Sequence, residues 1–227
     1  FIGLYLLLAG VVIGFWILAP VSALGLFLLI SLVHFGLGDT DLEETRPRIT
    51  QMLAHGGIVT LAIPLGHREE VTALFTMISG PHPVLWSLIE VVAVISTLAG
   101  AFYAFLAVKD ARLRRGFAEW LGLTVLVMLL PPLVGFALYF TLIHTPRHIL
   151  RITAALRDRQ PHLPVWGMTA GFTVATWAMA GIAFALLHDS VGVDAATLRI
   201  VFIGLAALTV PHMILIDGIF RPGLKAA

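Results

Sequence analysis

The stretch PPLVGFALYFTLIHTPRH, residues 131–148, decides the fold class of this chain. It is an apolar run that begins at two prolines, which end the preceding helix, and it closes on a pair of histidines. Similar apolar runs recur throughout the chain, in which 59% of the 227 residues are hydrophobic and 12% are charged. A mean hydropathy of +0.99 excludes an ordinary soluble domain. The sequence therefore predicts an all-α, polytopic integral membrane protein.

We predict about eight transmembrane segments, because each crossing needs roughly 20 apolar residues. The predicted segments are 1–18, 20–38, 49–66, 84–108, 117–131, 132–150, 165–187 and 198–219. We expect them to form a single transmembrane domain over residues 1–227. The chain opens at Phe1 with neither an initiating Met nor a basic leader, so we expect its natural start to lie upstream.

The basic residues predict the orientation in the membrane. With eight crossings, eleven of the 14 Lys and Arg residues fall on one side with Arg147 at its edge, and Arg68 and Arg199 fall on the other. The eleven are Arg46, Arg48, Lys109, Arg112, Arg114, Arg115, Arg151, Arg157, Arg159, Arg221 and Lys225. Such an excess marks the cytoplasmic side. We therefore predict a multi-pass protein of the cytoplasmic (inner) membrane.

Two properties of the composition exclude classes of function. The net charge of +1 gives no reason to expect nucleic-acid binding. The chain has no cysteine, which excludes disulfides, iron–sulfur clusters and thiolate zinc sites. Any metal site must therefore use nitrogen or oxygen ligands.

Histidines in the apolar segments are the candidate functional residues, because a polar group without a partner is costly in a bilayer core. Five of the nine histidines lie near the cytoplasmic ends of predicted segments, within roughly 10 Å of one membrane face at 1.5 Å per residue. They are His34, His55, His144, His148 and His212. The other four, which we expect to be solvated polar residues of the connections, are His67, His82, His162 and His188.

The His144–His148 pair has the spacing that places two imidazoles on one helix face. One metal ion can be reached by both rings, and ligation by nitrogen without thiolate suits iron, copper, zinc or nickel. The alternative is a hydrogen-bonded pair that interacts with the dipole at a helix end. The intramembrane setting favours the metal.

The other candidates carry open alternatives. Asp39 either orients a ligand imidazole or, with Asp41, begins a polar loop. His55 precedes two glycines and is either a ligand or a hydrogen-bonding residue of a tight helix contact. His212 can bond a carbonyl freed by the proline before it, and Asp217 is either its partner or a loop residue.

Five short pieces of sequence carry most of these residues. They are His34-Phe35-Gly36 with Asp39, Ala54-His55-Gly56-Gly57, Pro131-Pro132-Leu133, Tyr139-Phe140 with His144, Arg147 and His148, and Thr209-Val210-Pro211-His212-Met213-Ile214-Leu215-Ile216-Asp217. Together they resemble the Brp/Blh family of membrane β-carotene 15,15′-dioxygenases, found beside microbial rhodopsins. The resemblance covers essentially all 227 residues.

The resemblance implies an activity and a set of ligands. The implied enzyme uses Fe(II) and O2 to cleave β-carotene at its central 15,15′ double bond, which gives two molecules of all-trans-retinal. It works in membrane lipid and is functionally linked to a retinal-binding rhodopsin. The implied iron ligands are His34, His144 and His148. The implied supporting or wall residues of the cofactor site are His55, His212 and Asp39. The family pattern also has an earlier Pro-His-Gly…Asp helix that supplies another ligand, and we expect that helix to lie upstream of Phe1.

Two other classes remain open from the residues alone. The HxxxH spacing of His144 and His148 also occurs in membrane di-iron hydroxylases and desaturases, although those enzymes need several such boxes and this chain has one. A non-catalytic haem-binding membrane protein would need facing histidines on two helices. A transporter is disfavoured, because the polar residues gather near one face and not at the midplane.

Overall fold

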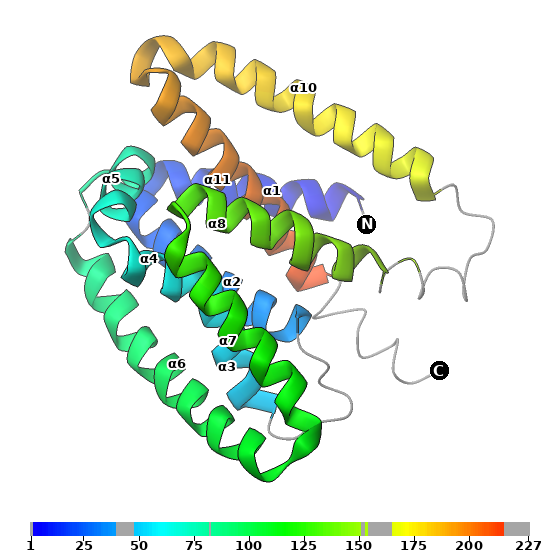
Figure 1. Ribbon diagram of the computed structural model, residues 1–227. Coiled ribbons are helices and arrows are strands. Elements are labelled where there is room, and N and C mark those ends of the chain that lie inside the picture. Colours follow the sequence, from blue (N-terminus) through cyan, green and yellow to red (C-terminus); the bar gives the residue numbers. More distant parts are fainter. Residues whose placement is uncertain (1, 40–47, 82, 151–152, 154–164, 216–227) are drawn as a thin grey trace. The chain divides into compact units, whose positions relative to one another are not determined.

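The computed structural model describes residues 2–39, 48–81, 83–150, 153 and 165–215. All regular elements in these ranges are helices (Figure 1), which confirms the all-α prediction. They form two compact units. Unit 1 comprises residues 1–27, 74–81 and 159–227, and unit 2 comprises residues 28–73 and 82–158. That the whole chain is a single domain stays a prediction.

Five helical runs among the described residues are long and apolar enough to cross a membrane. They are α2 (Pro20–Gly38), the run Arg48–Gly66, α6 (Pro83–Lys109), α10 (Val165–Val191) and α11 (Val193–His212) with its extension to Leu215. The shorter α1 (Ile2–Leu18) is also apolar. A helical membrane protein is therefore confirmed, whereas the count of eight crossings is not.

The fifth predicted segment is shorter than a full crossing, whereas the sixth is helical over all of residues 132–150. Extended backbone at Leu130 and Pro131 separates α7 (Arg114–Leu129) from α8 (Pro132–Leu138). The π-helix η3 (Tyr139–His144) follows α8, and helical backbone continues to residue 150. The predicted eighth segment runs to residue 219, and its last four residues lie outside the described ranges.

A short helix, α5 (Arg68–Ser79), occupies a connection for which we predicted no helix. Glu69 and Glu70 lie in its first turn, where negative charge interacts favourably with the helix dipole. Because the first turn of α5 is polar, a search for long apolar runs does not find this helix.

Unit 1 contains a helical hairpin of α10 and α11 that packs against α1. Gly192 joins the two helices with φ of +84°, a conformation that favours glycine because it has no Cβ. Tyr5 of α1 donates a hydrogen bond to the carbonyl of Leu208 at 2.6 Å. No residue in the most apolar stretch of α10 is buried, as expected of a helix that faces lipid.

Unit 2 is held together by two close helix contacts. At the first, glycines of α2 and α3 (Arg48–Gly57) lie against each other's backbone. A Cβ at Gly36 would collide with the carbonyl of Met52, and one at Gly56 would collide with the carbonyl of Leu32. Only glycine permits this approach at both positions. The contact fixes the end of α2 against α3, and this end of α2 carries His34.

The second contact of unit 2 is the hairpin of α6 and α7, joined by the turn η2 (Ala111–Leu113). Tyr103, Leu113 and Ala54 form a buried cluster against which Trp120 packs. The indole N–H of Trp120 also donates to the carbonyl of Ala54 at 2.8 Å, which ties α7 to α3. The hairpin thus supports the helix that carries His55.

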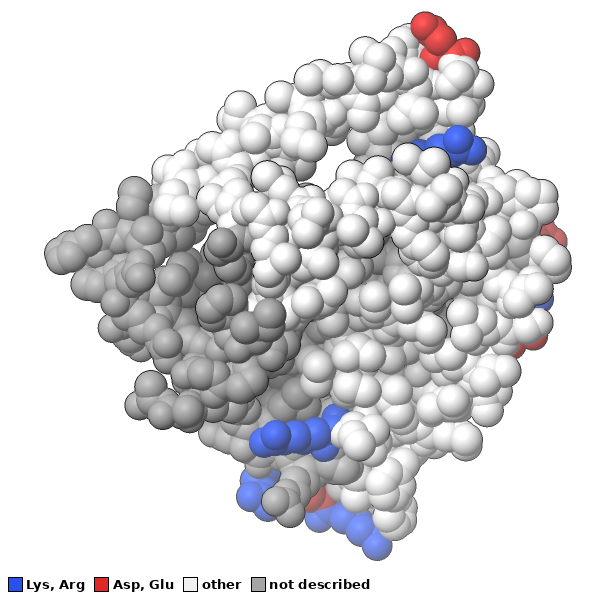
Figure 2. All heavy atoms as spheres, turned by 180° about the vertical axis from the view of Figure 1, so that it is seen from behind, with Lys and Arg blue, Asp and Glu red and all other residues white. Residues whose placement is uncertain are grey.

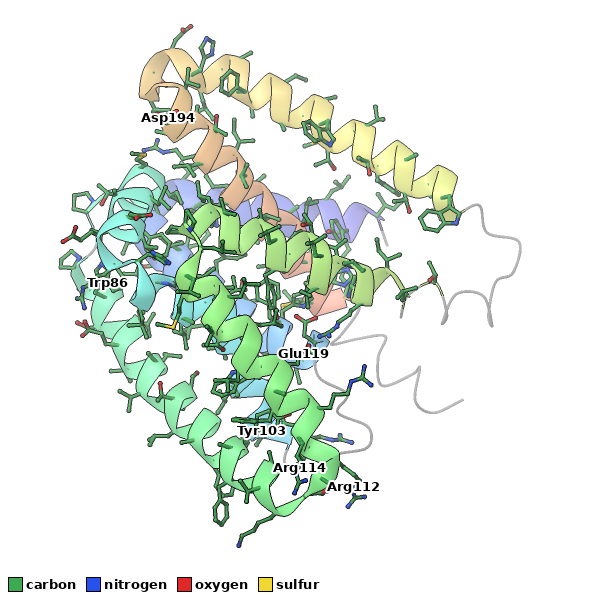
Figure 3. The ribbon with its side chains drawn as sticks, viewed as in Figure 1. Trp86, Tyr103, Arg112, Arg114, Glu119 and Asp194 are labelled. Atoms are coloured by element: carbon green, nitrogen blue, oxygen red, sulfur yellow. The ribbon has the colours of Figure 1, made fainter. Side chains whose placement is uncertain are left out.

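The surface agrees with a lipid environment. Most of the described surface in Figure 2 carries no Lys, Arg, Asp or Glu side chain, and large apolar side chains such as Leu98 and Trp177 are 65% and 76% exposed. Arg112 and Arg114 lie at the α6–α7 turn of unit 2 (Figure 3). The cytoplasmic orientation stays a prediction, and six of its basic residues lie outside the described ranges: Arg46, Arg151, Arg157, Arg159, Arg221 and Lys225.

Candidate functional site

The π-helix η3 builds one wall of the candidate site. Its hydrogen bonds join residues five apart, as in the bond from the Thr145 N–H to the carbonyl of Phe140. In an α-helix, side chains five apart point about 140° from each other, at 100° per residue. The wider π turn brings positions 139 and 144 onto one face, so Tyr139 and His144 both contact Asp39.

Three imidazoles meet in unit 2. The ring centroid of His34, near the end of α2, lies 5.0 Å from that of His144 and 6.1 Å from that of His148. The rings of His144 and His148 stack 5.8 Å apart at an interplanar angle of 15°. His34 and His144 are 7% and 5% exposed, and His148 is half-buried. The structure thus brings together the three histidines that we predicted as ligands.

These rings suit a metal ion in donor type and approximate spacing. A metal–nitrogen distance of about 2.1 Å places each centroid about 3.2 Å from the ion, and neighbouring centroids about 4.5–5.5 Å apart. The observed separation of 5.0 Å lies within this range, and those of 5.8 and 6.1 Å lie slightly above it. Across the described part of the chain, no three His, Asp or Glu side chains form a ready-made metal site. Ion binding would therefore have to draw the rings together.

Asp39 holds one of these imidazoles. It lies one residue beyond α2, and its side chain is 1% exposed. Its two carboxylate oxygens lie 3.2 and 3.3 Å from Nδ1 of His144, and Oδ2 accepts a hydrogen bond from the Tyr139 hydroxyl at 2.7 Å. An ionised carboxylate only accepts hydrogen bonds, so Nδ1 of His144 is the donor. Nε2 of His144 then carries the lone pair that a metal needs.

The surroundings of Asp39 favour its ionised form. Burial alone raises the pKa of the carboxyl, because it removes water from the charged state. The hydrogen bonds from His144 and Tyr139 and the charge of Arg147 act in the opposite direction. Their combined effect holds the pKa of Asp39 below its usual value. Asp39 is therefore a carboxylate at neutral pH.

Aromatic rings enclose the imidazole of His144. The ring of Phe35 lies edge-on to it, with centroids 4.7 Å apart and planes at 90°. Phe140 lies on another side at 5.6 Å, and Phe136 stacks on Phe140 at 5.8 Å. Apolar rings next to the nitrogen donors lower the local polarity, which suits a hydrocarbon ligand.

His55 has different surroundings. It is 3% exposed, and within the described ranges its Nδ1 has no hydrogen-bond partner. Its aromatic neighbour is Tyr103 of α6, at a centroid distance of 6.0 Å (Figure 3). His55 therefore lies in the packed contact of α3 with α6, and its role in cofactor binding stays a prediction.

The remaining predicted residues are distributed over both units. His212, at the end of α11 in unit 1, is half-buried, and its predicted role is untested. His67 and His188 are also half-buried, so they are less solvated than expected. Nδ1 of His188 donates to the carbonyl of Phe184 at 3.0 Å, and Nε2 lies 3.2 Å from Asp189. The residues outside the described ranges are Asp41, His82, His162 and Asp217.

Sequence reasoning assigned no role to three residues of the site. They are Tyr139, which donates to Asp39, and the ion pair of Arg147 with Glu119. The π turn that aligns Tyr139 with His144 has no simple sequence signal, because helical periodicity places the two residues on different faces. Glu119, a carboxylate inside an apolar segment, was a signal that could have been followed.

Comparison with known proteins gives consistent matches over nearly the whole chain. A family profile described as Beta-carotene 15,15'-dioxygenase matches residues 1–220. A beta-carotene 15,15'-dioxygenase from uncultured marine bacterium 66A03 is 36% identical over 220 residues, which cover 96% of this chain and 80% of that protein. A probable beta-carotene 15,15'-dioxygenase Blh from Halobacterium salinarum is 29% identical over 257 residues, covering 96% and 72%. No solved structure matches the chain.

Proposed function

Because the chain belongs to the beta-carotene 15,15'-dioxygenase family, we propose that it cleaves the central 15,15′ double bond of β-carotene with O2. The products are two molecules of all-trans-retinal. The reaction is balanced, since one carbon–carbon double bond is broken and each of its carbons gains one atom of the O2 molecule. The relatives' names support the carotenoid substrate.

The observation that carries the proposal is the meeting of three imidazoles beside a buried carboxylate. His34, His144 and His148 would hold Fe(II), which, when bound, supplies the activation of O2. Neutral imidazoles are required of such ligands, and the contact of Asp39 with Nδ1 of His144 fixes the tautomer that presents Nε2. The supporting roles predicted for His55 and His212 require no bond to the ion.

The apolar surroundings fit the proposed substrate. Phe35 and Phe140 flank His144 with hydrocarbon surface. The helices also expose large apolar side chains to the lipid, in which carotene dissolves and from which it can approach the site. We propose that the substrate arrives from the lipid of the cytoplasmic membrane. Retinal, the proposed product, would be consumed by a retinal-binding rhodopsin.

Isotope labelling tests this proposal. The purified protein, loaded with Fe(II) in lipid nanodiscs, is supplied with β-carotene and ¹⁸O2, and the aldehydes are reduced at once to prevent oxygen exchange. The proposal expects two C20 products per carotene, each with one ¹⁸O. One ¹⁸O per pair of products would indicate a monooxygenase, and fragments of unequal length would exclude central cleavage. The same sample can be examined for a haem Soret band, which the proposal does not expect.

A further inference from the structure

Arg147 connects the three-histidine site to α7. Its Nη1 donates to the backbone carbonyl of Asp39 at 3.3 Å, and its Nη2 lies 2.6 Å from Oε1 of Glu119. Figure 3 shows Glu119 on α7. Arg147 also lies between His144 and His148 in sequence. One guanidinium therefore joins the end of α2, the segment that carries two imidazoles, and α7.

The geometry makes this ion pair more than a surface contact. The side chains of Arg147 and Glu119 are each 32% exposed, so both charges are largely removed from solvent. A partly buried guanidinium that loses its carboxylate is left with an uncompensated charge and leaves its position. The carbonyl of Asp39 stands at the negative end of the α2 dipole, where a cation is favoured. Glu119 thus holds Arg147 in the orientation that reaches the main chain of Asp39.

We propose that Arg147 and Glu119 form a positioning pair that holds Asp39, and through its carboxylate His144, in the geometry needed for metal binding. Neither residue needs to touch substrate or metal for this role. Loss of the pair would let the main chain at Asp39 shift, and the hydrogen bond to Nδ1 of His144 would weaken. The inference rests on the proposed function, because metal affinity is the property that the pair would control.

Unit 2 offers a matched control. Arg68 and Glu90 form a second ion pair at 2.7 Å, with exposed fractions of 56% and 49%. Arg68 also lies 4.6 Å above the ring of Trp86, which is at the opposite end of α6 from the Arg112–Arg114 turn (Figure 3). This pair has the same chemistry but none of the contacts to Asp39.

Fe(II) titration under anaerobic conditions is the first test. We expect Glu119→Gln and Arg147→Met each to weaken Fe(II) binding by about 10–100-fold, the range for partners that orient metal ligands. The double variant should be no weaker than Arg147→Met, because the two residues act as one unit. Arg147→Lys should recover part of the affinity. Glu90→Gln and Arg68→Met should bind as the wild type does, and equal losses in the control pair would overturn the inference.

A metal-independent test uses ¹⁵N-histidine NMR of the metal-free protein in lipid, with the His144 signal assigned from its absence in His144→Asn. The wild type should show a protonated Nδ1 at His144, and Glu119→Gln should shift the population toward the Nε2–H form, whereas Glu90→Gln should not. An unchanged His144 signal and unchanged Fe(II) affinity in Glu119→Gln would overturn the positioning role and leave the proposed function intact. If Glu119→Gln shifts the His144 signal but the wild type binds no Fe(II), the positioning of His144 is supported and the proposed iron site is contradicted.

Discussion

His144 and His55 are both buried imidazoles next to a π turn, yet their neighbours differ. His144 is 5% exposed and closes η3, and His55 is 3% exposed and lies three residues before the π-helix η1 (Ile58–Ala62). His144 has a carboxylate at Nδ1 and two further imidazoles around it, whereas Nδ1 of His55 has no hydrogen-bond partner in the described ranges. Burial and helical position are therefore shared by both residues, and only the neighbouring groups separate a candidate ligand from a packing residue.

The largest effect should come from removing a ring of the three-histidine cluster. His34→Ala, His144→Ala and His148→Ala should each abolish retinal formation from β-carotene, because each ring supplies one of the nitrogen donors that hold the ion. The loss should exceed the about 10–100-fold change typical of residues that only orient a ligand. Retinal formation at the wild-type rate in His144→Ala would show that His144 is not a ligand and does not differ from His55 in this respect.

A smaller effect is expected from the carboxylate that distinguishes His144. Asp39→Asn keeps the size of the side chain but offers an amide that can also donate, so Nδ1 of His144 is no longer held as a donor. Fe(II) affinity should fall by about 10–100-fold. Tyr139→Phe removes only the hydroxyl that donates to Asp39 and should have a weaker effect. If Tyr139→Phe weakened binding more than Asp39→Asn, the carboxylate would not be the main orienting group.

A substitution at Gly56, next to His55, tests whether His55 lies in a tight helix contact. Gly56→Ala would drive a Cβ into the carbonyl of Leu32 and force α2 away from α3. Overpacking of this kind costs about 1–3 kcal/mol, so the thermal unfolding midpoint in detergent should fall. Gly122→Ala, where in the described ranges no atom of another element lies within 4 Å of the added methyl group, should be neutral or slightly stabilising. Equal destabilisation by both variants would contradict the close contact of α2 and α3.

The smallest effect is expected at His55 itself. His55→Leu replaces a buried polar ring by an apolar side chain of similar size. An unsatisfied buried polar atom costs about 1–3 kcal/mol, so the unfolding midpoint should stay the same or rise. Fe(II) binding should be retained. A large loss of stability would show that Nδ1 of His55 has a partner outside the described ranges.

Much of the fold could be predicted from the sequence. Long apolar runs and the Pro131-Pro132 pair located α1, α2, α6 and the break at Pro131, because the bilayer demands length and apolarity from a spanning helix. Length alone could not show that α7 is short, nor that the polar residues after Gly66 form α5. Tertiary packing decides such elements, and it leaves little periodic signal in a single sequence.

The site was predicted less completely. The spacing of His144 and His148 follows directly from α-helical geometry, and the convergence of His34 with them agrees with the family resemblance. The partners of Asp39 could not be predicted, because the π turn changes which side chains share a face with His144. The Arg147–Glu119 contact joins distant segments, and only the fold brings them together.

The central claim is that His144, and not His55, is a ligand of the iron. Its most direct test is the iron content per chain after anaerobic loading with Fe(II) and removal of unbound metal, measured by mass spectrometry for the wild type, His144→Ala and His55→Leu. We predict one iron per chain in the wild type and in His55→Leu, and almost none in His144→Ala. Two irons per chain in the wild type would instead favour a di-iron enzyme. Equal iron content in His144→Ala and the wild type would contradict the account.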